Sequence, residues 1–347
     1  MAHNMEYNID ILVAGCNTTC MHCYVNGGKA PAMSFQDFRL CMEKLSLSFE
    51  NLKGHISFTL DNELFNHPDA LQILTCVEQN YKSAYYHHGS TTGIAFLTHS
   101  KQTELFDILK RNEWDYVSFA IHGNRDTHDK IVNNSHGLES IIAASKLFRE
   151  HDFKIWVSLM MSKKLVSELE DMSYILSHMH YDSILPVIPD YFPTPRLIKY
   201  QHIRLNKCEF VDVIAFLLSR KVDVSDIEKQ VTLYNEETII QTVDADVLRE
   251  ELTSKSTAFF HIDYKLDFFL GNTGSPLMHL GNIKTLSSQE IHQCIVMAED
   301  NYYETESIHY NDIMFAISHG RLKRSGENYV YPSRIAGIIA MIKNKEV

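Results

Sequence analysis

The sequence predicts an α/β fold built from parallel βα units, and two observations lead to that class. Short strand-like runs alternate with helix-like stretches along the first two-thirds of the chain. At 45% hydrophobic and 22% charged residues, the composition is that of a globular protein with a substantial core. Alternation of strand and helix is the pattern expected of a parallel sheet covered by helices.

Strand-like runs form the framework of the predicted sheet. They cover residues 7–14, 55–60, 94–98, 116–121, 154–159 and 183–188. Six βα units are too few for a complete eight-unit barrel, and periodicity alone does not separate an open sheet from a partial barrel. The strand pattern therefore predicts the βα units but not how the sheet closes.

Helix-like stretches separate these strands. The clearest opens at Ser34, with Asp37 three residues later as a near capping box, and continues with apolar residues at helical spacing. The others are predicted over residues 68–80, 101–111, 137–150 and 164–178.

A change in composition after the sixth strand predicts a domain boundary. Four of the eight prolines lie between residues 186 and 195, which predicts a stiff, irregular loop over residues 186–196. We therefore expect an N-terminal domain over residues 1–205 and an α+β C-terminal extension over residues 206–347. Helices are predicted in the extension over residues 207–220, 287–299, 310–319 and 333–343, and a hairpin over residues 258–269.

Charge and residue usage narrow the classes of function. The formal net charge of −12 argues against nucleic acid as a partner, because an acidic field repels polyanions. No apolar run approaches the ~20 residues of a membrane span, and the first residues do not resemble a signal peptide. We expect a cytoplasmic protein with no membrane partner. Seven cysteines, three of them clustered, suit metal ligation in a reducing compartment better than a disulfide framework.

The clustered cysteines form the strongest motif. Cys16, Cys20 and Cys23 follow the first strand in the spacing C-x3-C-x2-C, which can wrap one metal centre. A cluster of four irons has four ligand positions, so three thiolates would leave one iron open. Zinc is a competing interpretation, but it usually takes four ligands in two pairs, and the sequence has no second C-x-x-C and no H-x3-H. A thiol redox pair at Cys20 and Cys23 would not need Cys16.

This cysteine spacing resembles the cluster-binding loop of the radical S-adenosylmethionine (SAM) enzymes. Further segments follow in the order that the family has them. Residues 61–68 resemble the family's Gly-Gly-Glu-Pro motif with its later His-Pro pair, although Asp61 and Asn62 replace the two glycines. Asn and Asp tolerate unusual backbone angles better than most residues.

Two later segments extend the resemblance. Residues 98–100 stand where the family often has Thr-Asn-Gly, and Ser118 with the His128-Asp129 pair is similar to the family's motif on the fourth strand. Family members often place an arginine shortly after the His-Asp pair, whereas this chain has Lys130, Ile131 and Val132 there.

The resemblance implies a fold, two cofactors and a set of residues that bind them. The fold is a partial (β/α)6 TIM-type barrel over residues 1–205, and the cofactors are a 4Fe-4S cluster on the three cysteines and SAM. Glu63 inherits the role of holding the amino group of SAM, and His22 stands where an aromatic residue usually packs against adenine. The implied cofactor-binding residues are His22, Tyr24, Asn62, Glu63, Thr98 and Ser118. No catalytic residue is assigned.

The family's chemistry is reductive. An electron enters the cluster, SAM is cleaved, and the resulting 5'-deoxyadenosyl radical abstracts a hydrogen atom from the substrate. An electron donor of the flavodoxin or ferredoxin type is the implied partner.

The C-terminal residues favour one class of substrate over others. They faintly resemble the SPASM extension of peptide-modifying family members, but residues 258–282 have no cysteine, which predicts a cluster-free remnant. We therefore expect a peptide or peptide-derived substrate. The alternatives are a small metabolite such as a sugar, nucleoside or amino acid, and a catalytically silent or zinc-binding scaffold.

Overall fold

The computed structural model describes most of the chain. The described residues are 5–23, 28, 30–50, 52, 54–189, 201–244, 248, 257–271, 278–297 and 314–343. Tyr24 and residues 190–196 of the predicted proline-rich loop lie outside them. Within the described residues, no helix is both long and apolar enough to span a membrane.

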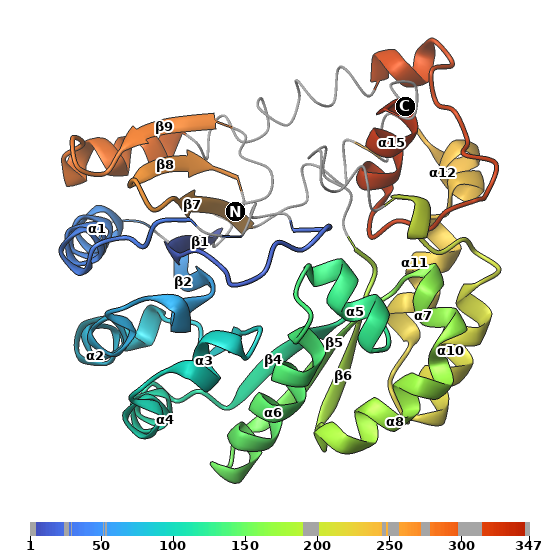
Figure 1. The fold of residues 1–347 in the computed structure, drawn as a ribbon. Coiled ribbons are helices and arrows are strands. Elements are labelled where there is room, and N and C mark those ends of the chain that lie inside the picture. The colour runs from blue at the N-terminus through green and yellow to red at the C-terminus, as the bar shows by residue number, and fades with distance from the viewer. Residues whose placement is uncertain are drawn as a thin grey trace.

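Parallel strands form the centre of the fold, and helices lie on their outer side (Figure 1). The strands are β1 (Met5–Ala14), β2 (Gly54–Asn62), β3 (His88–Ser90), β4 (Tyr116–Ile121), β5 (Lys154–Met160) and β6 (Ser183–Val187). Strand β1 pairs with β2, and β3 to β6 pair in order, always in parallel. An isolated parallel bridge between Phe58 and Tyr85 connects the two groups. This arrangement is the predicted partial (β/α)6 barrel.

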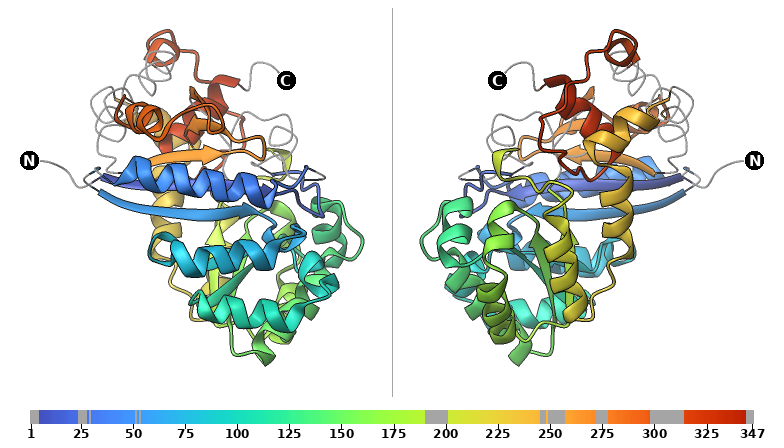
Figure 2. Two further views of the ribbon diagram at one scale, coloured as in Figure 1. Left: turned by 90° about the vertical axis from the view of Figure 1, so that its left-hand side faces the viewer. Right: turned by 90° about the vertical axis from the view of Figure 1, so that its right-hand side faces the viewer.

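Alternating side chains explain why helices cover the outer face of these strands. In β4, Val117, Phe119 and Ile121 are buried, and Phe119 lies against Phe148 of α6, the second helix after β4. The covering helices are α1 (Phe35–Phe49), α2 (Ala70–Asn80), α4 (Gln102–Arg111), α5 (Arg125–Val132), α6 (Gly137–Glu150) and α8 (Leu169–Met179). Figure 2 shows α1, α2 and α4 side by side along one flank. Short 3-10 turns are η1 (Leu64–Asn66), η2 (Lys82–Ala84) and η3 (Gln201–Ile203).

Most predicted elements are confirmed. The first helix begins after Ser34, whose hydroxyl accepts a hydrogen bond from the backbone N–H of Asp37 at 3.0 Å. The predicted strands over residues 7–14, 55–60, 116–121, 154–159 and 183–188 correspond to β1, β2, β4, β5 and β6.

The predicted third strand over residues 94–98 is wrong. These residues form the short helix α3 (Ile94–Thr98), and the third strand is His88–Ser90. A short apolar run does not reveal its period, so strand and helix look alike in the sequence. The single helix predicted over residues 164–178 is also wrong, because the chain breaks at Glu168 into α7 (Lys163–Ser167) and α8.

The C-terminal extension continues the barrel sheet. Strand β7 (Thr257–Ile262) pairs in parallel with the free side of β1, and β8 (Asp267–Leu270) and β9 (Met278–Asn282) follow in antiparallel pairing. Residues 288–297 are helical. The predicted hairpin is therefore confirmed, and it is joined to the barrel through β7. The boundary at residues 205 and 206 remains a prediction.

Helix α1 holds the segment that follows β9. The Lys44 ammonium donates hydrogen bonds to the carbonyls of Ile283, Lys284 and Leu286, the first at 2.7 Å. One turn further along α1, Ser48 donates to the carbonyl of Ser288 at 2.9 Å. These contacts join segments that are about 240 positions apart in the chain.

The remaining helices of the extension are α10 (Phe210–Ser219), α11 (Ser225–Leu233), α12 (Glu236–Thr242) and α15 (Arg334–Lys343). The buried side chains of α10 and α11 belong to the main core, whereas α12 and α15 build a small second core. Ile239 of α12 packs with Tyr331 and Ile338. The buried Glu236 carboxylate accepts hydrogen bonds from Ser325 and from the Tyr331 hydroxyl. Residues 314–318 form a further helical turn within the predicted helix over residues 310–319.

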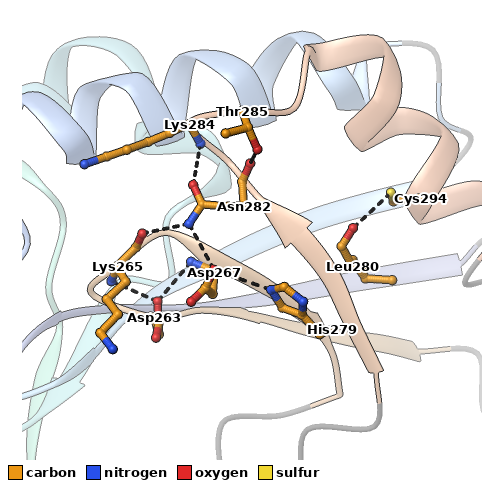
Figure 3. Close-up of polar contacts among 9 residues, drawn as sticks. All are labelled: Asp263, Lys265, Asp267, His279, Leu280, Asn282, Lys284, Thr285 and Cys294. Atoms are coloured by element: carbon orange, nitrogen blue, oxygen red, sulfur yellow. Dashed lines mark hydrogen bonds and ion pairs between the residues drawn. The ribbon is translucent and has the colours of Figure 1, made fainter.

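Polar side chains brace the β8–β9 hairpin (Figure 3). The Asn282 amide nitrogen donates to the Lys265 carbonyl at 2.9 Å and to the Asp267 carboxylate at 3.0 Å. Its amide oxygen accepts from the backbone N–H of Lys284 at 2.9 Å. Leu266, in the turn between β7 and β8, has a φ of 67°, which side-chain-bearing residues adopt only when neighbouring contacts stabilise it.

We expect Asn282→Ala to lower the free energy of unfolding by about 1–2 kcal/mol, because three hydrogen bonds are lost together. Urea denaturation measures this change. His279→Ala on the same hairpin is the control. The His279 side chain is 55% exposed, makes one long polar contact of 3.4 Å to Asp267 and lies against the Phe269 ring, so its replacement should change stability by less than ~0.5 kcal/mol. Equal effects from both variants would contradict the assignment of Asn282 as the brace.

Candidate active site

The parallel register of β1 and β2 brings the ends of both strands to one edge of the barrel. Ala14 pairs with Asn62, so the residues that follow each strand emerge side by side. The Asn66 amide nitrogen then donates to the Gly15 carbonyl at 3.0 Å. A Cβ at Gly15 would lie 2.3 Å from the Gly28 carbonyl oxygen, so only glycine fits this close approach.

Backbone hydrogen bonds hold the cysteine loop from two sides. The N–H of Cys16 donates to the Gly28 carbonyl at 2.7 Å. On the other side, Thr19 and Met21 donate to the carbonyls of Val132 and Ile131, at 3.2 and 2.9 Å, at the end of α5. The loop is therefore seated between its own return and the fourth βα unit.

The three thiols of this loop lie near one another. The Thr18 hydroxyl is 3.1 Å from the Cys16 sulfur and 3.3 Å from the Cys20 sulfur. Burial raises the pKa of Cys20 to about 11, and the neighbouring Cys16 and Cys23 add to that increase. Burial, followed by the nearby Glu63 carboxylate, also raises the pKa of Cys16.

This donor set fits an iron-sulfur cluster. The negative charges of clustered thiolates repel one another. Coordination to iron offsets this repulsion, because the positive charge of the metal balances the charge of the thiolates. Among the described residues, no group of three or more Cys, His, Asp or Glu side chains is arranged to hold one metal ion. A four-iron cluster takes each thiolate on a different iron. Cys16, Cys20 and Cys23 would hold three of those irons.

Glu63 lies directly after β2 and is 1% exposed. Its carboxylate accepts hydrogen bonds from the Thr91 hydroxyl at 2.9 Å and from the Thr92 hydroxyl and backbone N–H, both at 2.8 Å. Burial raises the pKa of Glu63, while these hydrogen bonds act in the opposite direction. The contacts fix the carboxylate in one position next to the cysteine loop.

The sequence did not point to Thr91 and Thr92. They follow the true third strand, β3, and continue into Gly93, which has a φ of 76° and begins α3. A Cβ at Gly93 would lie 2.7 Å from the Ala144 Cβ, so glycine is required there. The sequence signal for these two residues is Thr-Thr-Gly directly after a strand. The apolar run over residues 94–98 was predicted as that strand instead, so Thr91 and Thr92 were placed before it.

The structure does not bring Thr98 to this site. Thr98 is exposed at the end of α3, and its hydroxyl donates within that helix to the carbonyls of Ile94 and Ala95. Thr98 was predicted at the end of a strand, but it is the last residue of helix α3. It therefore lies beyond the edge of the barrel at which the strands end.

Of the other predicted residues, Asn62 lies at the edge of the barrel where the strands end, and Ser118 lies in the barrel interior. Asn62 has a φ of 73°, and its N–H donates to the Asp61 carboxylate at 2.8 Å, so these two residues make the turn in place of two glycines. Ser118 lies in the middle of β4, where its hydroxyl is 2.9 Å from that of Ser158 on β5. His67 contacts the Met33 carbonyl, and so links the motif to the return of the cysteine loop.

A row of three histidines borders a cavity beside the cysteine loop. The ring centroids of His22 and His122 are 4.4 Å apart, and those of His122 and His128 are 5.3 Å apart. Desolvation lowers the pKa of His22 and of His128 to about 4, and it lowers that of His122 well below the usual value. The cavity measures about 80 Å³, and Cys20 and Thr92 also line it.

Comparisons with known proteins show which family the residues around this site match. Residues 11–172 match the family model described as the radical SAM superfamily. None of the curated proteins matches the chain. Among solved structures, anSMEcpe with bound AdoMet is 17% identical with a TM-score of 0.52, over 82% of this chain and 80% of that one. The same protein with AdoMet and the Cp18Cys peptide gives the same values.

Streptococcus suis SuiB bound to precursor peptide SuiA is 12% identical with a TM-score of 0.51, over 77% of this chain and 59% of that chain. At these identities the structural likeness shows the fold, a partial TIM-type barrel.

We expect Thr91→Val to lower the free energy of unfolding by about 1–3 kcal/mol, because it leaves a buried carboxylate short of a donor. Thr98→Val makes the same chemical change at an exposed position and should cost less than ~0.5 kcal/mol. Urea denaturation of the two variants compares them directly. A larger cost at Thr98 would contradict the placement of both residues.

Proposed function

We propose that this chain, whose residues 11–172 match the model of the radical SAM superfamily, cleaves SAM reductively at a 4Fe-4S cluster on Cys16, Cys20 and Cys23 and acts on a peptide or peptide-derived substrate. Enzymes of this superfamily use both cofactors. The observation that carries the proposal is the set of three neighbouring thiols seated beside the buried Glu63. When bound, the two cofactors supply a 5'-deoxyadenosyl radical that abstracts a hydrogen atom from the substrate.

The residues of the chain would bind and orient the cofactors. The three thiolates hold the cluster and leave one iron open. Glu63 holds the amino group of SAM, and its position is set in advance by Thr91 and Thr92. Preorganisation of this kind reduces the cost of binding, because the carboxylate does not have to be ordered by the ligand.

Two of the similar structures support a peptide as the substrate. The anSMEcpe and SuiB structures both contain bound peptides, and the chain shares their fold. Strands β7 to β9 of this chain and the helix after them form the segment whose sequence resembles the SPASM extension.

A small metabolite is the second candidate. Cys294 is the single cysteine among the described residues of these strands and this helix, so they lack the several cysteines that bind the auxiliary clusters of a SPASM extension.

An electron donor is required by radical SAM enzymes. We propose a small carrier of the flavodoxin or ferredoxin type, in a cytoplasmic compartment that keeps the seven free thiols reduced. The roles of His22, Asn62 and Ser118 in binding SAM remain proposals, as does that of Tyr24, which lies outside the described residues.

We expect the triple variant Cys16→Ala, Cys20→Ala, Cys23→Ala to lose the iron-sulfur absorbance after anaerobic reconstitution and to form no 5'-deoxyadenosine with SAM and a strong reductant. Chromatography of the reaction measures the product. Cys208→Ala is the matched control, because Cys208 is exposed and far along the chain, and it should behave as the unaltered protein.

The competing outcomes are distinct. Zinc in protein purified without oxygen, together with no cluster after reconstitution, would establish the scaffold interpretation instead. If 5'-deoxyadenosine forms, incubation with deuterated peptides or metabolites identifies the substrate class, since the hydrogen that the radical abstracts carries its label into 5'-deoxyadenosine.

A further inference from the structure

Aromatic rings and serines follow one pattern on the inner face of three neighbouring strands. Each of β3, β4 and β5 carries a ring followed two positions later by a serine: His88 and Ser90, Tyr116 and Ser118, and Trp156 and Ser158. Residues two apart in a strand point to the same face. The intervening Val117 and Val157 are buried on the opposite face, which the helices cover. The inner face of these strands therefore has a layer of rings beside a layer of serines.

The three rings form one stacked row. The ring centroids of His88 and Tyr116 are 4.5 Å apart at 19°, and those of Tyr116 and Trp156 are 4.0 Å apart at 14°. Large branched side chains normally fill the interior of a barrel of parallel strands. The serine layer does not fill it, and Ser90 is exposed, so solvent reaches the inner face beside the rings.

The row of rings stops at Trp156. The next strand is β6, where Ser183 is the register partner of Trp156. Among the described residues, Tyr116 is the only ring that contacts Trp156. A serine side chain is too small to cover the face of an indole. A further ring placed beside Ser183 would continue the stack, and stacked aromatic pairs stabilise binding beyond the area that they bury.

A cavity borders this end of the row. Ser183 and Leu185 line it together with the start of α11 and the turn before that helix, and it measures about 370 Å³. Ligand sites commonly measure ~300–1,000 Å³. Leu185 is 49% exposed and gives the cavity an apolar wall, whereas Arg220 and Asp226 add polar groups. This mixture suits a ring that carries a hydrogen-bonding atom, such as a phenol or an indole.

Strand β6 also offers its backbone. It is the last strand of its sheet and pairs with β5 on one side, and no strand in the described part of the chain pairs with its other side (Figure 1). An edge of this kind leaves backbone N–H and C=O groups open, and extended peptides bind such edges by strand addition. The open edge therefore favours a residue within a peptide over a free metabolite.

We propose that the space beside Trp156 and Ser183 anchors an aromatic residue of the peptide substrate, tyrosine or tryptophan, while the peptide backbone runs along β6. The inference rests on the proposed function, because it names a feature of the peptide on which the enzyme acts. Trp156 precedes Met160, the last residue of β5, by four positions, which is ~13 Å along a strand. The anchored residue would thus be about four positions from the residue that reacts at the strand ends, and Trp156 determines specificity without touching the reacting atoms.

Two matched pentapeptides test this anchor. The reconstituted full-length protein is titrated calorimetrically with Ac-Ala-Ala-Tyr-Ala-Ala-NH2 and with the same peptide carrying leucine at its centre. The tyrosine peptide should bind about 10-fold more tightly, because leucine cannot stack on Trp156. Ser183→Phe fills the open end of the row and should weaken the tyrosine peptide by about 10-fold. Trp156→Leu removes the stacking surface and should bring the two affinities within about twofold of each other.

Tryptophan fluorescence gives a readout that a purely structural role of the row would not change. The chain has two tryptophans, so Trp114→Phe leaves Trp156 as the only one. In that variant, the saturating tyrosine peptide should lower the quenching of Trp156 by acrylamide about twofold, because the bound ring covers the indole face. The leucine peptide at the same concentration should leave the quenching unchanged.

An exposed serine supplies the control. Ser177 lies on the outside of α8, so Ser177→Phe makes the same chemical change away from the row and should leave both affinities unchanged. Circular dichroism and the cluster absorbance establish that each variant is folded and loaded. The anchor is overturned if the unaltered protein binds the two peptides equally or binds neither, or if Ser183→Phe binds the tyrosine peptide undiminished.

Failure of the anchor differs from failure of the proposed function. Protein that forms the cluster and cleaves SAM but does not prefer the tyrosine peptide keeps the proposed cleavage and loses the anchor. Protein that selects the tyrosine peptide through Trp156 but yields no 5'-deoxyadenosine under reduction keeps the anchor and loses the proposed chemistry.

Discussion

The parallel register between β1 and β2 is the constraint on which the candidate site depends. Pairing of Ala14 with Asn62 makes both strands end at one level, so the cysteine loop and Glu63 emerge next to each other. The register between these two strands shifts between Leu12 and Ala14, directly before the cysteine loop begins. A slip of one residue would reverse the two faces of β1 and move Tyr7, Ile9 and Ile11 out of the core. Burial of that apolar face therefore maintains the geometry of the site.

Elements with a local signal can be predicted from the sequence. The cap at Ser34 and the alternation in β4 are properties of adjacent residues, and both elements lie where they were predicted. The third strand carries no such signal, because His88–Ser90 is three residues long and contains no β-branched or large aliphatic residue. Pairing with β4 supplies the stability that these residues lack by themselves. Tertiary context thus overrides propensity at β3.

In the candidate site, too, residues that belong to a local motif can be predicted from the sequence, whereas residues that come from distant segments cannot. The cysteine spacing and Glu63 stand out in the sequence because each belongs to a compact motif. The residues around them do not: Thr91 is 28 positions from Glu63, and His122 is 100 positions from its neighbour His22. These residues lie together because they follow adjacent strands of the partial barrel, an order that the sequence does not show. Among 19 histidines, His128 stands out in the sequence through the His-Asp pair, but nothing in the sequence places His122 next to His22 before the fold is known.

The pairing of β7 with β1 changes how the C-terminal extension relates to the barrel. In register, Asp10 of β1 lies opposite His261 of β7, and the His261 ring stacks on Phe269 of β8 with centroids 4.5 Å apart. Side chains from both ends of the chain therefore share one inner face. Without β7, the backbone groups along one side of β1 would lose their partners, and that strand carries the cysteine loop. The hairpin is in turn held by Lys44 and Asn282 through hydrogen bonds, so its folding needs no cysteine ligands. An extension joined in this way contributes to the barrel itself, and a cut after residue 205 would weaken the strand that the cluster loop depends on.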